Sequence, residues 1–287
     1  MTSELSQRLA AAFKSACLAE LETLKPGNVH IFADGHGMLV DDFVRSAEAA
    51  STVIARPGLP VGQRILSAVD ATWDAVGCNT NLGIILLCAP LLQAAELGGE
   101  AGLRANLDVV LKGLTVEDAA LSYRAIVRAT PAGLGQSERH DVRQPPQVTL
   151  LQAMQEAEGR DRIAWQYAHG FADVFDFGVP RYQESASRWG WSAWAATAVY
   201  LGFLARFPDS HIARKHGEVT AKQVMAEAAE HQQALLALEN PKNYQRELLR
   251  YDADLKARGL NPGTSADLTV ATLLVVALQR YLWKKIG

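Results

Sequence analysis

The sequence predicts an all-α fold, a single-domain multi-helix bundle of about a dozen helices over residues 1–287. Alanine and leucine recur at helical spacing through nearly every segment. Runs of alternating β-branched residues between hairpin turns, which would indicate strands, are almost absent. Apolar residues make up 49% of the 287 residues, enough to bury a substantial core.

The expected helices follow this apolar periodicity, with ends set by glycine, proline and capping residues. They cover residues 3–23, 41–55, 60–76, 80–97, 101–112, 115–129, 148–157, 160–176, 180–207, 218–238, 241–257 and 264–284. The longest non-helical stretch is 130–147. It contains several charges and five helix-breaking residues, Pro131, Gly133, Gly135, Pro145 and Pro146. We interpret it as a functional loop rather than a linker, because long structureless inserts in compact domains usually serve a function.

Composition and charge exclude several classes of partner. A net charge of −3 and a pI near 6.2 argue against nucleic acid, because phosphate-backbone binding depends on dense Lys and Arg. Cys17, Cys78 and Cys88 lie in apolar helical sequence without close spacing, which indicates reduced core residues and argues against zinc or disulfides. The longest apolar run, 84–92, contains Pro90 and is too short for a membrane span. We expect a cytoplasmic protein with small-molecule partners, and a homodimer is possible.

The most informative stretch is 261–269, where a loop-type opening runs directly into an apolar helix. Pro262 and Gly263 break the preceding backbone, and Thr264 or Ser265 can cap the helix. Free N–H groups at such a helix start attract anions such as phosphate, and Asp267 is the one acid at the junction. An ordinary capped helix is the alternative interpretation.

A first polar cluster at residues 25–38 connects two amphipathic helices. Gly27 allows a backbone N–H to approach a ligand, Lys25 can neutralise phosphate, and Asn28 can hold a ribose or base edge. His36 could act as an acid or base. The alternative is a polar turn with a Pro-Gly bend. Asp41 lies at the start of the next helix, where we interpret it as a capping acid, with metal binding as the second interpretation.

Two further clusters precede the middle of the chain. Asn79, Thr80 and Asn81 stand immediately before an apolar helix, where three polar groups exceed what one cap requires, although capping is the alternative for each. Glu138 and Asp141 follow a glycine-containing loop at 131–135. Such acids suit a nucleotide-bound Mg²⁺, since hard cations take oxygen ligands, and a solvated loop is the alternative.

A fourth cluster at residues 207–217 concentrates charge at a helix end. Its polar members are Asp209, His211, Arg214, Lys215 and His216, followed by Gly217. Simple C-capping by cations and glycine is the alternative. His169 and His231 lie within amphipathic helices and are interpreted as structural or surface residues.

Together, four segments resemble the triphosphoribosyl-dephospho-CoA synthase family in order and separation. They are Lys25-Pro26-Gly27-Asn28-Val29, Asn79-Thr80-Asn81-Leu82-Gly83, Pro208-Asp209-Ser210-His211 with Arg214-Lys215-His216-Gly217, and Pro262-Gly263-Thr264-Ser265-Ala266-Asp267-Leu268. The resemblance implies an all-α fold and a Mg²⁺-dependent reaction. In that reaction a dephospho-CoA hydroxyl attacks the ribose anomeric carbon of ATP and releases adenine. The product is the prosthetic-group precursor of citrate or malonate decarboxylation systems.

The chain also departs from this family pattern. The family typically has a Lys-Pro-Gly-Leu-Val-Asp motif, in which Asn28 replaces the leucine and His30 the aspartate. Asn81-Leu82 replaces the His-Lys pair that the family tends to have. The chain therefore looks like a divergent branch from archaea and methylotrophic bacteria. There, ATP-using assembly of a one-carbon cofactor such as tetrahydromethanopterin or methylofuran is an alternative function, and non-catalytic nucleotide binding is a third.

The leading hypothesis is nucleotide-dependent transfer at a pocket where the four segments meet. Asp267 or Asp209 would stabilise positive charge on the ribose, and His36 or His211 would take the acceptor proton. Lys25, Arg214 and Lys215 would screen the triphosphate. Nucleotide contacts are also expected from Gly27, Asn28, Asn79, Thr80, Asn81, His216, Gly263, Thr264 and Ser265, and Mg²⁺ contacts from Asp41, Glu138 and Asp141.

Overall fold

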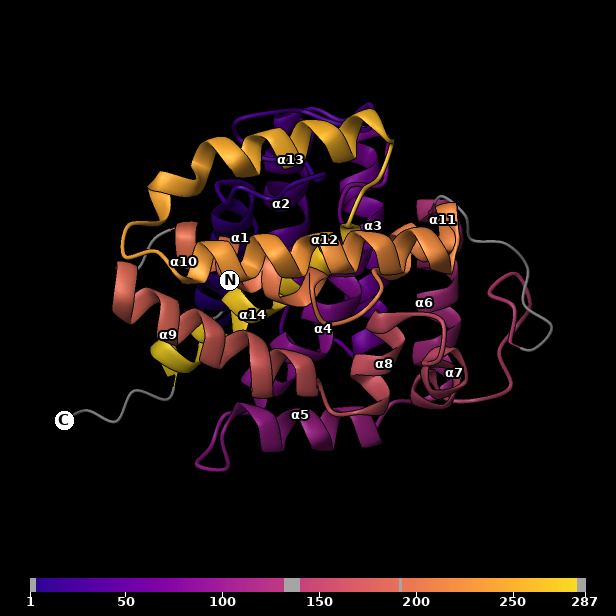
Figure 1. Ribbon diagram of the computed structural model, residues 1–287. Coiled ribbons are helices and arrows are strands. Elements are labelled where there is room, and N and C mark those ends of the chain that lie inside the picture. Colours follow the sequence, from indigo (N-terminus) through magenta and orange to yellow (C-terminus); the bar gives the residue numbers. More distant parts are fainter. Residues whose placement is uncertain (1–3, 132–139, 191–192, 283–287) are drawn as a thin grey trace. The chain divides into compact units, whose positions relative to one another are not determined.

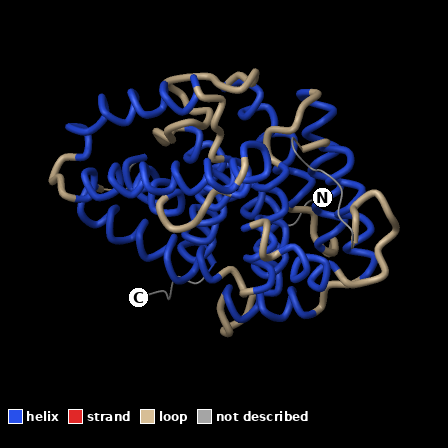
Figure 2. The backbone as a smooth tube through the Cα atoms, turned by 45° about the vertical axis from the view of Figure 1, so that its right-hand side comes forward, coloured by secondary structure: helices blue, strands red, loops and turns tan. Residues whose placement is uncertain are grey.

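The computed structural model describes residues 4–131, 140–190 and 193–282, and over these ranges it confirms the all-α prediction. The described residues form fourteen α-helices, one π-helix and one 3-10 helix (Figure 1). No strand occurs among them, as Figure 2 shows, and the extended contacts are two isolated bridges, His30 with Ala33 and Gly35 with Met38. No described helix is both long and apolar enough to cross a membrane.

The chain divides into two compact units. The first unit comprises residues 1–16, 42–172 and 274–287, and the second comprises 17–41 and 173–273. Helices α1 (Glu4–Leu21) and α14 (Gly263–Leu282) contribute residues to both units. The expectation of a single functional domain stays a prediction.

The first unit is built around an apolar helix. It contains most of α2 (Val40–Ile54), together with α3 (Val61–Val76), α4 (Leu82–Leu97), α5 (Leu103–Lys112), α6 (Val116–Ala129), α7 (Leu150–Ala157) and α8 (Arg162–Ala168). Helix α4 is apolar on all sides, which suits a helix buried on all sides, and it packs against α3, α5 and α8. The Tyr167 hydroxyl of α8 donates to the Leu86 carbonyl at 2.6 Å, which fixes α8 on α4.

Helices α3 and α6 pack closely because a glycine and a capping acid meet there. Thr115 and Asp118 form a capping box at the start of α6, and the Asp118 Oδ1 also accepts the Gly62 backbone N–H at 2.8 Å. A Cβ on Gly62 would lie 2.6 Å from the Asp118 Cα. Only glycine therefore permits this approach.

The second unit has its own core. It contains the π-helix η1 (Asp173–Gly178), α9 (Val179–Trp189), α10 (Ala193–Leu204), α11 (Ser210–His216), α12 (Glu218–Leu236), the 3-10 helix η2 (Pro241–Tyr244) and α13 (Gln245–Ala257). Helix α10 is apolar on all sides and packs against α9 and α12 (Figure 1). Leu204, Ile212, Val224 and Leu255 belong to one buried cluster that joins α10, α11, α12 and α13.

Three expected boundaries differ from the structure. The expected helix 160–176 ends early, since α8 stops at Ala168 and Phe171 takes a left-handed φ of 58° before η1 begins. The expected helix 180–207 is divided at Gly190, whose φ is 86°. The 207–217 segment forms a short helix of its own, α11, with Asp209 as its N-cap. Left-handed positions and helices as short as seven residues carry too little periodicity to show in the sequence.

We predict that Gly62→Ala lowers the free energy of unfolding by about 1–3 kcal/mol, because the new methyl group forces α3 and α6 apart. Gly159→Ala is the matched control, since its φ is not positive and no atom lies within 4 Å of the added Cβ. Urea denaturation of both variants measures the difference. Equal midpoints would contradict the close packing of α3 on α6.

Candidate functional site

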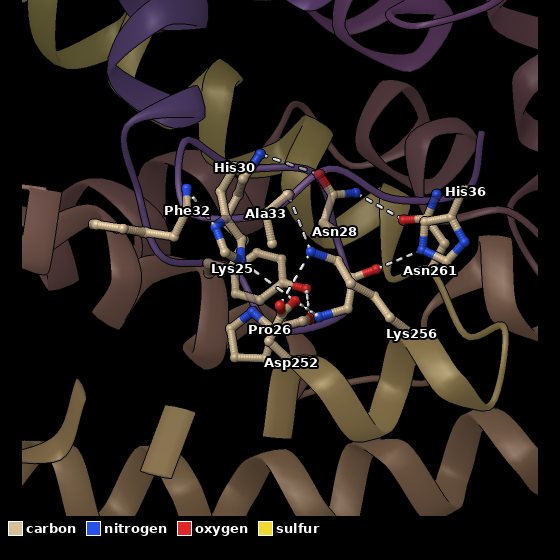
Figure 3. Close-up of polar contacts among 12 residues, drawn as sticks. Lys25, Pro26, Asn28, His30, Phe32, Ala33, His36, Asp252, Lys256 and Asn261 are labelled. Atoms are coloured by element: carbon tan, nitrogen blue, oxygen red, sulfur yellow. Dashed lines mark hydrogen bonds and ion pairs between the residues drawn. The ribbon is translucent and has the colours of Figure 1, made fainter. Parts of the chain in front are cut away.

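Three of the four polar segments contact one another in the second unit. The Asn28 Nδ2 donates to the Asn261 Oδ1 at 2.7 Å, which joins the 25–38 segment to the start of the 261–269 segment. The Asp209 carboxylate accepts two hydrogen bonds from Ser265, which joins the 207–217 segment to the same place. Figure 3 shows the 25–38 side chains beside Asp252, Lys256 and Asn261.

Lys25 and Asn28 are bonded inside the protein rather than presented to a ligand. Lys25 is completely buried and pairs with Glu20, and its Nζ donates to the Asn28 Oδ1 at 3.1 Å. Burial lowers the pKa of Lys25 and raises the pKa of Glu20, while their mutual attraction opposes both shifts. The expected contacts of these two residues with phosphate and ribose stay predictions.

Gly27 is required by packing. Its φ is +82°, and a Cβ there would lie 2.9 Å from both the Leu255 Cδ1 and the Pro262 Cδ. The Gly27 N–H donates to the Asp252 Oδ1 at 2.8 Å, and the neighbouring Pro26 carbonyl accepts from the Tyr200 hydroxyl at 2.6 Å. The N–H that was expected to approach a ligand is therefore occupied by a protein carboxylate.

The contacts of His36 define which of its two ring nitrogens carries the hydrogen. It is half-buried with a left-handed φ of 57°, and its Nε2 lies 2.8 Å from the Gly27 carbonyl oxygen. A carbonyl oxygen only accepts hydrogen bonds, so Nε2 must carry the hydrogen. In the neutral ring the lone pair then resides on Nδ1, which is the atom able to accept a proton.

Asp209 joins the N-termini of two helices. Its Oδ1 accepts the N–H groups of His211 and Ile212 at 2.9 and 3.3 Å, and its Oδ2 accepts the N–H and hydroxyl of Ser265, each at 2.8 Å. Complete burial raises its pKa, although these hydrogen bonds act in the opposite direction. The anion at the Ser265 N–H of α14 is therefore the protein's own Asp209, where the sequence predicted phosphate.

His211 lies among cationic groups. A Cβ on Gly263 would lie 3.1 Å from the His211 Nδ1, so the glycine leaves room for the ring. Burial, followed by the charges of Arg214, Lys215, His36 and His216, lowers the pKa of His211 to about 4. His211 is consequently a neutral ring in a positive field and a weak base.

The remaining members of this cluster differ in exposure. Arg214 and Lys215 are exposed in the last turn of α11, where cations can reach an anion. His216 is half-buried, with its Nε2 3.1 Å from the Gly259 carbonyl oxygen. Thr264 is buried and Asp267 is half-buried in the first turns of α14. The charge of Asp267 contributes to the pKa of Lys25, so the two groups share an electrostatic environment.

The 77–83 segment belongs to the first unit, and its side chains form hydrogen bonds within that unit. The Asn79 Oδ1 accepts the Leu82 N–H at 3.1 Å, as a cap of α4 would. The Thr80 hydroxyl donates to the Ser46 Oγ at 2.6 Å, and the Asn81 Nδ2 donates to the Thr72 Oγ1 at 3.1 Å. Their expected contacts with a nucleotide stay predictions.

Of the three expected metal ligands, the structure describes Asp41 and Asp141. Among the described residues, no three His, Cys, Asp or Glu side chains are arranged to hold a metal ion. Asp41 is exposed in the first turn of α2, and Asp141 accepts the Arg143 N–H at 2.8 Å. Glu138 lies outside the described residues. A metal that enters with a nucleotide needs few protein ligands, so Mg²⁺ stays a prediction.

Sequence reasoning gave no role to Glu20, Asp252 and Lys256, which hold the 25–38 segment in place. Asp252 and Lys256 lie four residues apart on α13, a pattern typical of a solvated helix face. Glu20 reads as one more surface charge of α1. The available signal was the buried Lys25, which needs an acid, but burial of a lysine is not visible in the sequence.

The comparisons agree with this fold. The sequence model of the family described as ATP:dephospho-CoA triphosphoribosyl transferase matches residues 6–286. A crystal structure of a protein from Archaeoglobus fulgidus, provisionally assigned as a triphosphoribosyl-dephospho-CoA synthase, superposes with a TM-score of 0.64. It shares 21% identity and covers 83% of this chain and 98% of its own, so the likeness establishes the fold. No curated protein matches the chain.

We predict that protonation of His211 destabilises the fold in mild acid. Its pKa is about 4 when folded and near 6.5 when unfolded, so the unfolded chain binds more protons between these values. The free energy of unfolding should therefore fall as the pH drops from 6.5 to 4, by at most about 3 kcal/mol from this group. Urea denaturation of wild type and His211→Asn at pH 7 and pH 4.5 measures it. An equal pH dependence in both proteins would contradict the prediction.

Proposed function

Because the chain belongs to the ATP:dephospho-CoA triphosphoribosyl transferase family, we propose that it transfers the triphosphoribosyl group of ATP to dephospho-CoA at the polar site of its second unit. The family match over residues 6–286 carries this proposal, since it spans nearly the whole chain. The chain is a transferase of this family. The assignment of its site residues rests on the chemistry of the side chains.

The proposed reaction exchanges one bond at the ribose. An acceptor hydroxyl oxygen forms a bond to the anomeric carbon of ATP as the bond from that carbon to adenine breaks, and adenine departs with the electron pair. The hydroxyl proton passes to the Nδ1 of His36. This nitrogen carries no hydrogen in the neutral ring, because the Nε2 holds the hydrogen that it donates to the Gly27 carbonyl. His211 is the weaker candidate, because burial and the neighbouring cations lower its pKa to about 4.

The other side chains act by charge. Positive charge develops on the ribose as adenine leaves, and the half-buried Asp267 would stabilise it. Arg214 and Lys215, exposed at the end of α11, would bind the triphosphate. Asp209 would position these groups, since its hydrogen bonds join α11 to α14.

Three further assignments belong to this proposal. We propose that Mg²⁺ enters with ATP and contacts Asp41, and it would neutralise triphosphate charge. The three cysteines are free thiols and two of them are buried, which supports a cytoplasmic protein. A homodimer is also proposed, and sedimentation velocity would test it.

We predict that the protein releases adenine from ATP only when Mg²⁺ and dephospho-CoA are both present. Chromatography of the reaction mixture identifies the product directly. Release of ADP or AMP instead would indicate an ATP-using enzyme with different chemistry. Saturable ATP binding without any turnover would indicate a binding protein and would contradict the proposal.

We predict that His36→Gln lowers kcat about 10²–10⁴-fold, because glutamine can still donate to the Gly27 carbonyl but has no basic nitrogen. Steady-state rates of adenine release measure the loss. A kcat within twofold of wild type would remove His36 from the mechanism.

We predict that Lys215→Gln raises the KM for ATP about tenfold while kcat changes little, because a triphosphate contact is lost in the ground state and transition state alike. Lys222→Gln is the matched control, since Lys222 is an exposed lysine of α12 paired with Glu218. Equal KM values for the two variants would place the triphosphate elsewhere.

A further inference from the structure

Asp252 is a buried carboxylate at the centre of the contacts that hold the 25–38 segment. Its side chain is 4% exposed. Its Oδ1 accepts the Gly27 N–H at 2.8 Å and lies 3.3 Å from the His30 Nε2, and its Oδ2 accepts from the Lys256 Nζ at 3.0 Å. Burial alone would raise its pKa, but these donors together lower it, so the group is an anion at neutral pH.

His30 faces this anion as a neutral ring. Its Nδ1 accepts the Phe32 N–H at 3.3 Å, so the ring hydrogen resides on Nε2, the atom directed at Asp252. Burial lowers the pKa of His30, which keeps the ring uncharged. Lys256 supplies the positive charge and also donates to the Ala33 carbonyl at 3.1 Å. Helix α13 thus holds the 25–38 segment at Gly27, His30 and Ala33 (Figure 3).

Gly27 links this carboxylate to His36. The N–H of Gly27 is held by Asp252, and the carbonyl of the same residue accepts from the His36 Nε2. The position of the Gly27 backbone therefore decides whether the His36 ring keeps its hydrogen on Nε2 and its lone pair on Nδ1.

His36 lies in a tight turn. It has a left-handed φ of 57°, a conformation that costs a residue other than glycine about 1 kcal/mol or more. The reciprocal backbone hydrogen bonds between Gly35 and Met38 close this turn, and the His36 ring is held by the Gly27 carbonyl.

We propose that Asp252 is a positioning residue that orients His36 and fixes its proton on Nε2 by holding the backbone of Gly27. The inference rests on the proposed function for the role of His36, and on geometry alone for the coupling between Asp252 and the His36 ring. Asp252 touches no reacting atom. Its effect on the reaction should appear in kcat and leave the KM for ATP unchanged, because no triphosphate contact is altered.

The test compares two substitutions of the same kind on α13. Asp252→Asn keeps the size of the side chain but removes its charge and places an amide donor opposite Lys256 or Gly27. Asp254→Asn is the control, since Asp254 is 57% exposed and pairs with Arg258 at the surface. We expect Asp252→Asn to lower kcat at least tenfold with the KM for ATP within twofold of wild type. The control should match wild type in both.

A spectroscopic measurement separates positioning from loss of stability. In protein labelled with ¹⁵N-histidine, long-range ¹H–¹⁵N spectra report which nitrogen of His36 carries the hydrogen. We expect the Nε2–H form in wild type and Asp254→Asn, and a mixture of both forms in Asp252→Asn. A folded Asp252→Asn protein that retains the pure Nε2–H form would overturn the proposal.

A second pair of variants covers the case in which Asp252→Asn does not fold. His30→Leu removes the polar ring nitrogen that lies 3.3 Å from Asp252, whereas His30→Gln can still place an amide N–H there. We expect the His36 form to shift in His30→Leu and to be preserved in His30→Gln, and identical spectra for the two would overturn the proposal. If the wild type releases no adenine, the proposed function fails, while these spectra still decide the coupling of Asp252 to His36.

Discussion

The Asp209 carboxylate is the interaction on which the organisation of the second unit most depends. It is completely buried, and both of its oxygens accept hydrogen bonds from the first residues of helices, His211 and Ile212 on one side and Ser265 on the other. Helix N-termini attract anions, so one carboxylate satisfies two ends that burial would otherwise leave unpaired. The 207–217 and 261–269 segments are held together for this reason, and the cations of α11 are positioned near the start of α14.

Electrostatics divides the polar residues of this unit into two groups. Lys25, Glu20, Asp252 and Lys256 are paired within the protein, where they stabilise the backbone. Arg214 and Lys215 are exposed, so an external anion can reach them. A buried charge is retained only with a partner, whereas an exposed one is available to a substrate. The division explains why charged residues of similar type have different places in the proposed mechanism.

The helical fold was largely predictable, because apolar periodicity is a local property that each segment carries by itself. The break at Phe171 and the separate helix α11 were not predictable, since a left-handed φ and a helix of seven residues depend on tertiary contacts. At the site, the contact of Asn28 with Asn261 spans 233 positions and leaves no local signal. The burial of Lys25 was hidden for a related reason, because lysine is almost always exposed and its partner Glu20 reads as one more surface charge of a helix.

The contact between His30 and Asp252 has an evolutionary consequence. Position 30 is one of the places where the chain departs from the pattern it otherwise resembles, which has an aspartate there. In this fold an acid at that position would bring a second negative group against Asp252, at a depth where water cannot screen their repulsion. Substitutions at residues 30 and 252 are therefore expected to occur together. A homologue with an acid at one position should carry a neutral or basic side chain at the other.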